Sequence, residues 1–200
     1  MADNVSILDA TDATVVIATK DRSSVHYQRG QRDVVTVTTS YTREANTTAY
    51  AAGDAVSDSA TTPTALTFAA VARANGGSGR ILSATMLDSI VPTTLGFFKL
   101  WLFVGTPVIP DSGAAFDDNV AFALPDVEMD GTNNRCVGVI SFAAWHSTGL
   151  GYFSQYHGPE IPFICNASND DLWGLVTVDN AYQSSANSNV LKFWLEIEQD

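Results

Sequence analysis

The sequence predicts an all-β protein, an antiparallel β-sandwich or jelly roll with an extended N-terminal arm and long loops. Apolar and polar residues alternate with a period of two in several runs, and no long run has a helical period. Hydrophobic residues make up 46% of the 200 residues and charged residues only 16%. Because one β-sandwich often reaches this length, we assign residues 33–200 to a single sandwich domain and residues 1–32 to the arm.

The most strand-like run is residues 97–104. Alternation divides its apolar side chains between two faces, with Phe98, Leu100, Leu102 and Val104 on one and Phe97, Trp101 and Phe103 on the other. Because both faces are largely apolar, we expect this run to be the central strand, buried on both sides, with Trp101 in the core.

The C-terminal run, residues 192–198, alternates more strictly. Phe193, Leu195 and Ile197 point one way, and charged side chains occupy most of the positions between them. This pattern predicts a strand with one face in the core and the other in water.

Residues 1–32 differ in composition from the rest of the chain, since charges of both signs surround one short apolar run at 14–18. Such a segment has too little apolar surface to build a core alone. Its β-branched Val15, Val16 and Ile17 suit a strand added to the sheet edge of a neighbouring subunit. We therefore predict an extended arm that serves assembly.

The other elements are short strands separated by turns and loops. We expect strands at 34–41, 65–69, 81–88, 137–142, 153–157, 161–164 and 172–178, with a short edge strand inside the loop at 42–64. The strand at 81–88 follows a glycine-rich turn at 75–79 and is predicted to form a hairpin with 97–104. The proline-marked strands at 153–157 and 161–164 are expected at sheet edges.

Residues 105–134 form a long excursion that contains three prolines, and residues 124–130 could form one helical turn. Within it, Asp126, Glu128 and Asp130 imitate the first half of a calcium loop. The twelfth position of that loop is Val137, which cannot supply the closing carboxylate, so we interpret the stretch as a solvated turn. The acidic positions at 117–119 are interpreted in the same way.

No pattern of residues names a reaction or a cofactor. His26, His146 and His157 lack the spacing of a metal site, and the glycine-rich stretches at 76–80 and 149–151 match neither a nucleophile elbow nor a phosphate loop. We therefore predict no enzyme, no cofactor and no metal. Cys136 and Cys165 are interpreted as buried free thiols, not as a disulfide or a metal pair.

Trp145, Tyr152 and Tyr156, together with Phe153, form the one aromatic cluster that could hold a ligand. Aromatic rings offer flat apolar area to a sugar, so the cluster is a possible surface platform. Packing in the core or at an interface is the alternative, and the sequence leaves both open.

Charge and hydropathy limit the partners. Ten basic against 22 acidic side chains give a net charge of −12, which repels phosphate backbones and predicts no nucleic-acid binding. No run approaches the ~18 apolar residues of a membrane span, and the opening residues do not look like a signal peptide. We therefore expect no membrane association.

Several segments carry a family resemblance. They are residues 40–43, 47–56, 65–68, 72–79, 100–103 and 136–142, together with 2–5 and 25–29 of the arm. These segments resemble a family of tailed-bacteriophage virion structural proteins, and the chain is most like a capsid decoration, or cement, protein.

The resemblance implies a position on the outer surface of the phage head, with the major capsid protein and sister subunits as partners in a homo-oligomer, most often a trimer. Candidate contacts with the capsid or a sister subunit are Val15, Val16, Ile17, His26 and Tyr27. The alternative function is a host-glycan-binding module of a tail or head fibre, which would use the aromatic cluster.

Overall fold

The computed structural model describes residues 4–8, 14–22, 25–28, 33–107, 116–124, 129 and 135–200, the first three ranges by their backbone alone. The chain divides into two compact units, Met1–Arg32 and Asp33–Asp200. Each unit is described by itself.

The first unit contains three antiparallel strands, β1 (Asn4–Leu8), β2 (Thr14–Arg22) and β3 (Val25–Gln28), with β2 in the middle. The predicted strand at 14–18 is part of β2. Its backbone pairs with β1, where Ile7 lies opposite Val15 and Val5 opposite Ile17. This local pairing differs from the predicted extended arm, because the apolar run finds a second β-branched run nearby in sequence. The side chains of Val15, Val16, Ile17, His26 and Tyr27 lie outside the described part, so the contacts predicted for them stay predictions.

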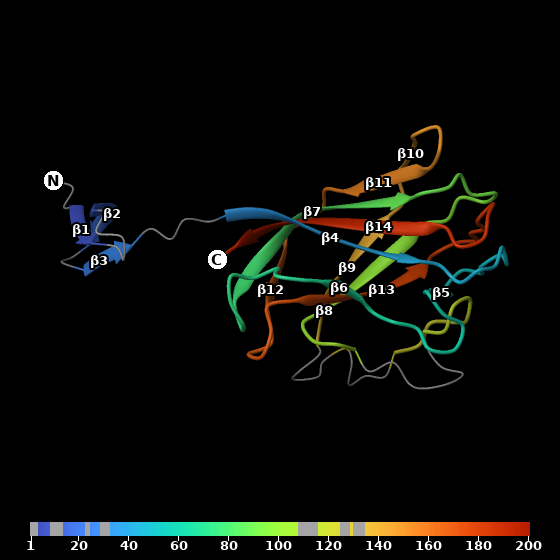
Figure 1. Ribbon diagram of the computed structural model, residues 1–200, viewed down its shortest axis with the longest axis horizontal. Helices are drawn as coiled ribbons and strands as arrows, with labels where there is room; N and C mark the ends of the chain where they lie inside the picture. The colour runs from blue at the N-terminus through green and yellow to red at the C-terminus, as the bar shows by residue number, and fades with distance from the viewer. Residues whose placement is uncertain are drawn as a thin grey trace. The chain divides into compact units, whose positions relative to one another are not determined.

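The second unit is an all-β sandwich of two antiparallel sheets (Figure 1), as predicted; a jelly-roll connectivity stays a prediction. The six-stranded sheet has the order β10-β11-β7-β14-β4, and β12 also pairs with β7. Its strands are β4 (Asp33–Thr42), β7 (Ser78–Asp88), β10 (Trp145–Ser147), β11 (Tyr152–Tyr156), β12 (Ile161–Ile164) and β14 (Val190–Gln199).

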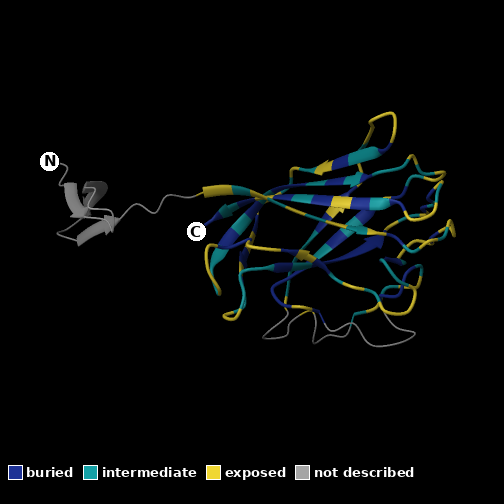
Figure 2. Ribbon diagram, in the orientation of Figure 1, coloured by how far each residue is buried: buried dark blue, intermediate teal, exposed yellow. Residues whose placement is uncertain are grey.

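The five-stranded sheet has the order β5-β13-β8-β9, and β6 also pairs with β13. Its strands are β5 (Ala55–Val56), β6 (Leu66–Phe68), β8 (Phe98–Phe103), β9 (Cys136–Phe142) and β13 (Leu172–Val178). The main core lies between the two sheets, where the dark-blue buried positions of both layers meet (Figure 2).

Alternation fills this core as the sequence indicates. Phe193, Leu195 and Ile197 of β14 are fully buried, whereas Lys192 and Glu196 between them are exposed. The prediction of a C-terminal strand with one face in water is confirmed.

The predicted hairpin between 81–88 and 97–104 is wrong. β7 pairs with β14, β11 and β12, whereas β8 pairs with β13 and β9 in the other sheet. The connection after Asp88 therefore crosses from one layer to the other, and it is held by main-chain bonds from Ser89 to Val190 and from Thr94 to Gln183. Closeness in sequence favoured a hairpin, but partners distant in sequence occupy both edges of each strand.

β8 is central in its sheet, yet its two faces differ. Leu100 and Leu102 are fully buried in the main core, while on the other face Trp101 is half-buried and Phe97 is 43% exposed. The prediction that both faces are buried is therefore correct only in part. A loop, not a third layer, covers the outer face around Phe103.

Of the two strands predicted at sheet edges, one is an interior strand. β11 lies between β10 and β7 and is an interior strand, whereas β12, which contains Pro162, pairs only with β7. The predicted helical turn and the calcium-like acidic stretch at 126–131 fall outside the described residues, apart from Leu124 and Met129.

Candidate functional site

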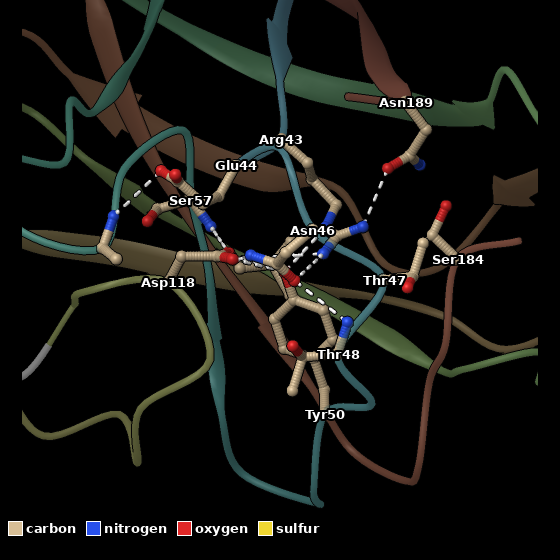
Figure 3. Close-up of polar contacts among 12 residues, drawn as sticks. Arg43, Glu44, Asn46, Thr47, Thr48, Tyr50, Ser57, Asp118, Ser184 and Asn189 are labelled. Carbon is tan, nitrogen blue, oxygen red and sulfur yellow. Dashed lines mark hydrogen bonds and ion pairs between the residues drawn. The ribbon is translucent and has the colours of Figure 1, made fainter. Parts of the chain in front are cut away.

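The densest group of polar side chains in the described residues lies inside the sandwich domain. We call it the Arg43 cluster, and its members are Arg43, Tyr50, Asp88, Asp118, Tyr182 and Asn189. Figure 3 shows Arg43 and Tyr50 of the loop after β4 together with Asp118 and Asn189, which come from two other loops. All six side chains are buried, so each donor and acceptor needs a partner within the protein.

Arg43 is the centre of the cluster. Its Nε donates a hydrogen bond of 2.6 Å to the hydroxyl of Tyr50, and its NH1 group donates one of 3.0 Å to Oδ1 of Asn189. The guanidinium also lies 4.7 Å from the centroid of the Tyr50 ring and 4.0 Å from Oδ2 of Asp118. A buried cation is tolerated when it is paired and hydrogen-bonded in this way.

Asp118 receives donors from two directions. The Tyr50 hydroxyl donates to its Oδ1 at 2.6 Å, and the Ser57 main-chain N–H donates to the same oxygen at 2.9 Å. Burial raises the pKa of the Asp118 carboxyl, while these bonds and the charge of Arg43 oppose the rise. Asp118 thereby fixes the segment 116–122 to the sandwich.

Asn189 joins the second carboxyl to the cluster. Its Nδ2 donates to Oδ1 of Asp88 at 2.9 Å, and the Tyr182 hydroxyl donates to the other carboxyl oxygen at 2.8 Å. Burial also raises the pKa of Asp88. Since every bond in the cluster is internal, its chemistry is that of an anchor between loops.

The sequence interpretation missed this cluster. The stretch at 117–119 is a turn, as expected, but Asp118 is only 5% exposed instead of solvated. Its partner Tyr50 lies 68 positions away in sequence. No spacing rule connects residues so far apart.

The predicted aromatic platform does not lie on the outer surface. Cross-strand register places Trp145 in line with Ser154, Met86 and Phe193, a row that faces the core. Trp145 packs edge-on against Phe98, with 5.7 Å between ring centroids.

Tyr152 and Tyr156 alternate with Phe153 on β11, so they share the inward face with Trp145. Tyr156 packs against the core, and its hydroxyl donates to the Pro159 carbonyl at 3.1 Å. Trp145 and Tyr156 therefore take the core-packing role that was the alternative to a platform, and Tyr152 lies half-buried on the same face.

The outer face of the six-stranded sheet is the broadest exposed surface with binding character. We call it the open face, since no other described element of residues 33–200 lies over it (Figures 1 and 2). Its outward side chains include Thr36, Thr38, Ser40, Thr85, Leu87, Phe153, Lys192, Trp194 and Glu196. Hydroxyls lie along β4, and the rings of Phe153 and Trp194 lie on β11 and β14.

Half-buried Trp194 lies near the middle of the open face between two shallow hollows. The first, of about 350 Å³, is lined by Thr38, Ser40 and Lys192 beside the indole. The second, of about 260 Å³, is lined by Thr36, Thr85 and Glu196. The Ser83 hydroxyl donates to Glu196 at 2.7 Å, which fixes that carboxylate in place.

A group of charged side chains lies at one end of the open face. Arg80 pairs with Glu160 at 2.8 Å and with Glu198 at 3.3 Å. Next to it, Ile164 is 60% exposed above a third hollow of about 480 Å³. The open face thus combines a central aromatic ring with exposed apolar residues at its rim.

The described residues contain no candidate metal cluster and two free thiols. No group of three His, Cys, Asp or Glu side chains there could hold a metal ion. Cys136 and Cys165 are both free, and only Cys165 is fully buried. None of the described helices is long and apolar enough to cross a membrane.

Comparison with known proteins adds no relative. No protein-family model matches the chain, and no curated protein or solved structure matches it either.

Proposed function

We propose that the protein is a bacteriophage capsid decoration protein, which binds the outer surface of the head and stabilises the shell without catalysis. The family resemblance of the sequence suggests the capsid. The structural observation that carries the proposal is the open face, with Trp194 at its centre and no described element of residues 33–200 over it.

The open face has the make-up of a protein–protein contact. Interface cores are depleted in charge and enriched in aromatic residues, and tryptophans near the centre often supply most of the binding energy. On this face Trp194, Leu87 and Phe153 provide apolar area, while threonine hydroxyls offer short hydrogen bonds. Lys192 and Glu196 lie on either side of the indole, and the other charges of the face, Arg80, Glu160 and Glu198, lie toward one end.

Binding to the capsid would stabilise the shell by linkage. A protein that binds only the assembled shell shifts the assembly equilibrium toward it. The candidate contacts Val15, Val16, Ile17, His26 and Tyr27 would add to the same attachment. The resemblance also implies that the protein self-associates.

The test is to mix the protein with heads that lack it and to measure occupancy by sedimentation. Trp194→Ala should lower the affinity at least ~30-fold, since a central tryptophan is worth roughly 2 kcal/mol or more. Phe97→Ala is the matched control, because Phe97 is an exposed aromatic on the outer face of the other sheet. Equal occupancy for wild type and Trp194→Ala would remove the open face from the proposal.

A host-glycan-binding module is the second candidate, and the surroundings of Trp194 favour it. An indole flanked by hydroxyls and by the fixed carboxylate of Glu196 offers both stacking and hydrogen bonds to a sugar ring. The copy number in virions distinguishes the two functions. A decoration protein occurs in the copy number of capsid subunits, whereas a fibre module occurs in a few copies at the tail.

A further inference from the structure

Strand β4 ends the six-stranded sheet and has one free edge. Its other edge pairs with β14 over its whole length, from Asp33 opposite Gln199 to Thr42 opposite Val190. Just beyond, the N–H of Arg43 donates to the Asn189 carbonyl at 3.0 Å. Hydrogen bonding alternates along an antiparallel pair, so the main-chain groups of Val34, Thr36, Thr38 and Ser40 point to the free edge. Within residues 33–200 no described strand pairs with that edge.

This edge lacks the features that keep sheet edges from pairing. Natural edges are short, bulged, or blocked by lysine or proline. β4 is ten residues long, pairs without a bulge, and has no lysine, proline or glycine; Asp33 is its single charge. At the far side of the same sheet, edge strand β10 has only three residues. In the other sheet the edge strands β5 and β6 have two and three residues, and β9 at the opposite edge has seven, fewer than the ten of β4.

The core-facing side of β4 is incompletely covered. Val35, Val37 and Tyr41 are each half-buried, although they pack against the main core. On neighbouring β14, Leu195 and Ile197, which lie opposite Val37 and Val35, are fully buried. An added strand beside β4 would cover the exposed part of these side chains.

We propose that the β4 strands of two copies of this chain pair antiparallel across a two-fold axis and join their sheets into one. A strand can pair with the same strand of a second copy when no like charges face each other across the pair. Between Val34 and Thr42 the strand carries no charge, in a chain whose net charge is −12. Asp33, at the end of the strand, is already paired with Arg73 at 3.0 Å. Between Val34 and Thr42, two copies can therefore pair along the edge of β4 with no like charges facing each other.

An axis at Thr38 gives matching pairs. It sets Thr36 opposite Ser40 of the second copy, with hydroxyls on both sides, and Val35 opposite Tyr41 of the second copy on the core side. Both kinds of cross-strand pair are favourable. The contact is independent of capsid binding, and it gives a two-fold dimer in place of the trimer that the resemblance implies.

Cross-linking tests the axis. In a hydrogen-bonded antiparallel pair the opposed Cα atoms lie about 5.5 Å apart, within the range that a disulfide spans. Thr38→Cys, in full-length protein with Cys136→Ala, should form a covalent dimer under mild oxidation. Thr67→Cys is the matched control, because Thr67 is an exposed strand threonine on β6. Equal yields of covalent dimer from the two variants would overturn the proposed axis.

A proline tests the main-chain contact. Thr38→Pro removes an N–H that points to the free edge and leaves the bonds to β14 in place. Sedimentation of the full-length protein should show a dimer for wild type and for Thr38→Ala. Thr38→Pro should raise the dimer dissociation constant at least ~10-fold.

Wild-type protein that sediments as a monomer or as a trimer would overturn the proposal, and so would a Thr38→Pro dimer of unchanged affinity. If Thr38→Pro fails to fold, the cysteine experiment decides alone.

Discussion

The two sheets each carry a tryptophan on their outer face, yet the two faces differ in what covers them. On the five-stranded sheet Trp101 lies 5.3 Å from Phe122 by ring centroids, and its indole donates to the Thr177 hydroxyl at 3.1 Å. On the six-stranded sheet Trp194 lies between two hollows, with no described segment of residues 33–200 above it. The same residue type therefore belongs to a second apolar cluster in one place and to an open sheet face in the other.

The difference lies in a loop and its attachment, not in the strands. Phe116 and Phe122 complete a small apolar cluster over Phe103 and Leu175. Asp118 lies between these two phenylalanines and is held inside the Arg43 cluster. A buried polar anchor thus decides which sheet face becomes interior, and the face without an anchored loop stays available for a partner.

Removing the anchor should have the largest effect. Asp118→Ala leaves Arg43 buried without its carboxylate and frees the covering loop, so we expect a loss of about 3–5 kcal/mol in the free energy of unfolding. Urea denaturation would measure it. Asp118→Asn keeps the side-chain volume and an oxygen for the Ser57 N–H, and it should lose less. A loss below about 1 kcal/mol for the alanine variant would contradict the anchor.

The two tryptophans should respond unequally to truncation. Trp101→Ala removes a half-buried ring and its bond to Thr177, and we expect a loss of about 2–3 kcal/mol, somewhat below the value for a fully buried tryptophan. Trp194→Ala should change stability by less than about 1 kcal/mol, as surface substitutions do. Thermal and urea unfolding of the two variants give the comparison directly. Equal losses would mean that the two faces are equally part of the core.

The buried carboxyls should leave a pH signature. Burial raises the pKa of Asp88, so this group favours the folded state while it is protonated. That contribution is complete below the unfolded pKa of about 3.9 and disappears as pH rises through the folded pKa. The free energy of unfolding of wild type relative to Asp88→Asn should therefore fall across this window. Denaturation at a series of pH values would measure it, and a difference that rises with pH would contradict the sign.

The smallest effect concerns the thiols. Cys136 packs against the small apolar cluster around Phe103 and Phe116, whereas Cys165 belongs to the main core. Burial there raises the thiol pKa of Cys165 to about 11. In native protein near pH 8 we expect Cys165 to react far more slowly than a free thiol does. Asp118→Ala should speed labelling of Cys136 several-fold through local opening of the loop and leave Cys165 unchanged. Mass spectrometry of labelled peptides would separate the two sites.

Sequence patterns predicted where the strands lie better than which strands pair with each other. Alternation identified β14 and its buried residues Phe193, Leu195 and Ile197 because the period of a strand is local. It also located β8, but it could not show that a loop with Phe116 and Phe122 covers Trp101. The pairing of β7 with β14, and the meeting of Arg43 with Asp118, join residues far apart in sequence. Composition and periodicity carry no information about contacts between residues so distant in sequence.

The position of β14 has a consequence for biosynthesis. This strand lies between β4 and β7 and supplies the partner for one edge of each, yet residues 190–199 are translated after both. A growing chain on the ribosome must therefore carry β4 and β7 with those edges unpaired until β14 emerges. Pairing across such long stretches of sequence is slow, and unpaired edges are prone to aggregation. The sheet is therefore completed late in translation, and chains interrupted before residue 190 should be recovered as aggregates.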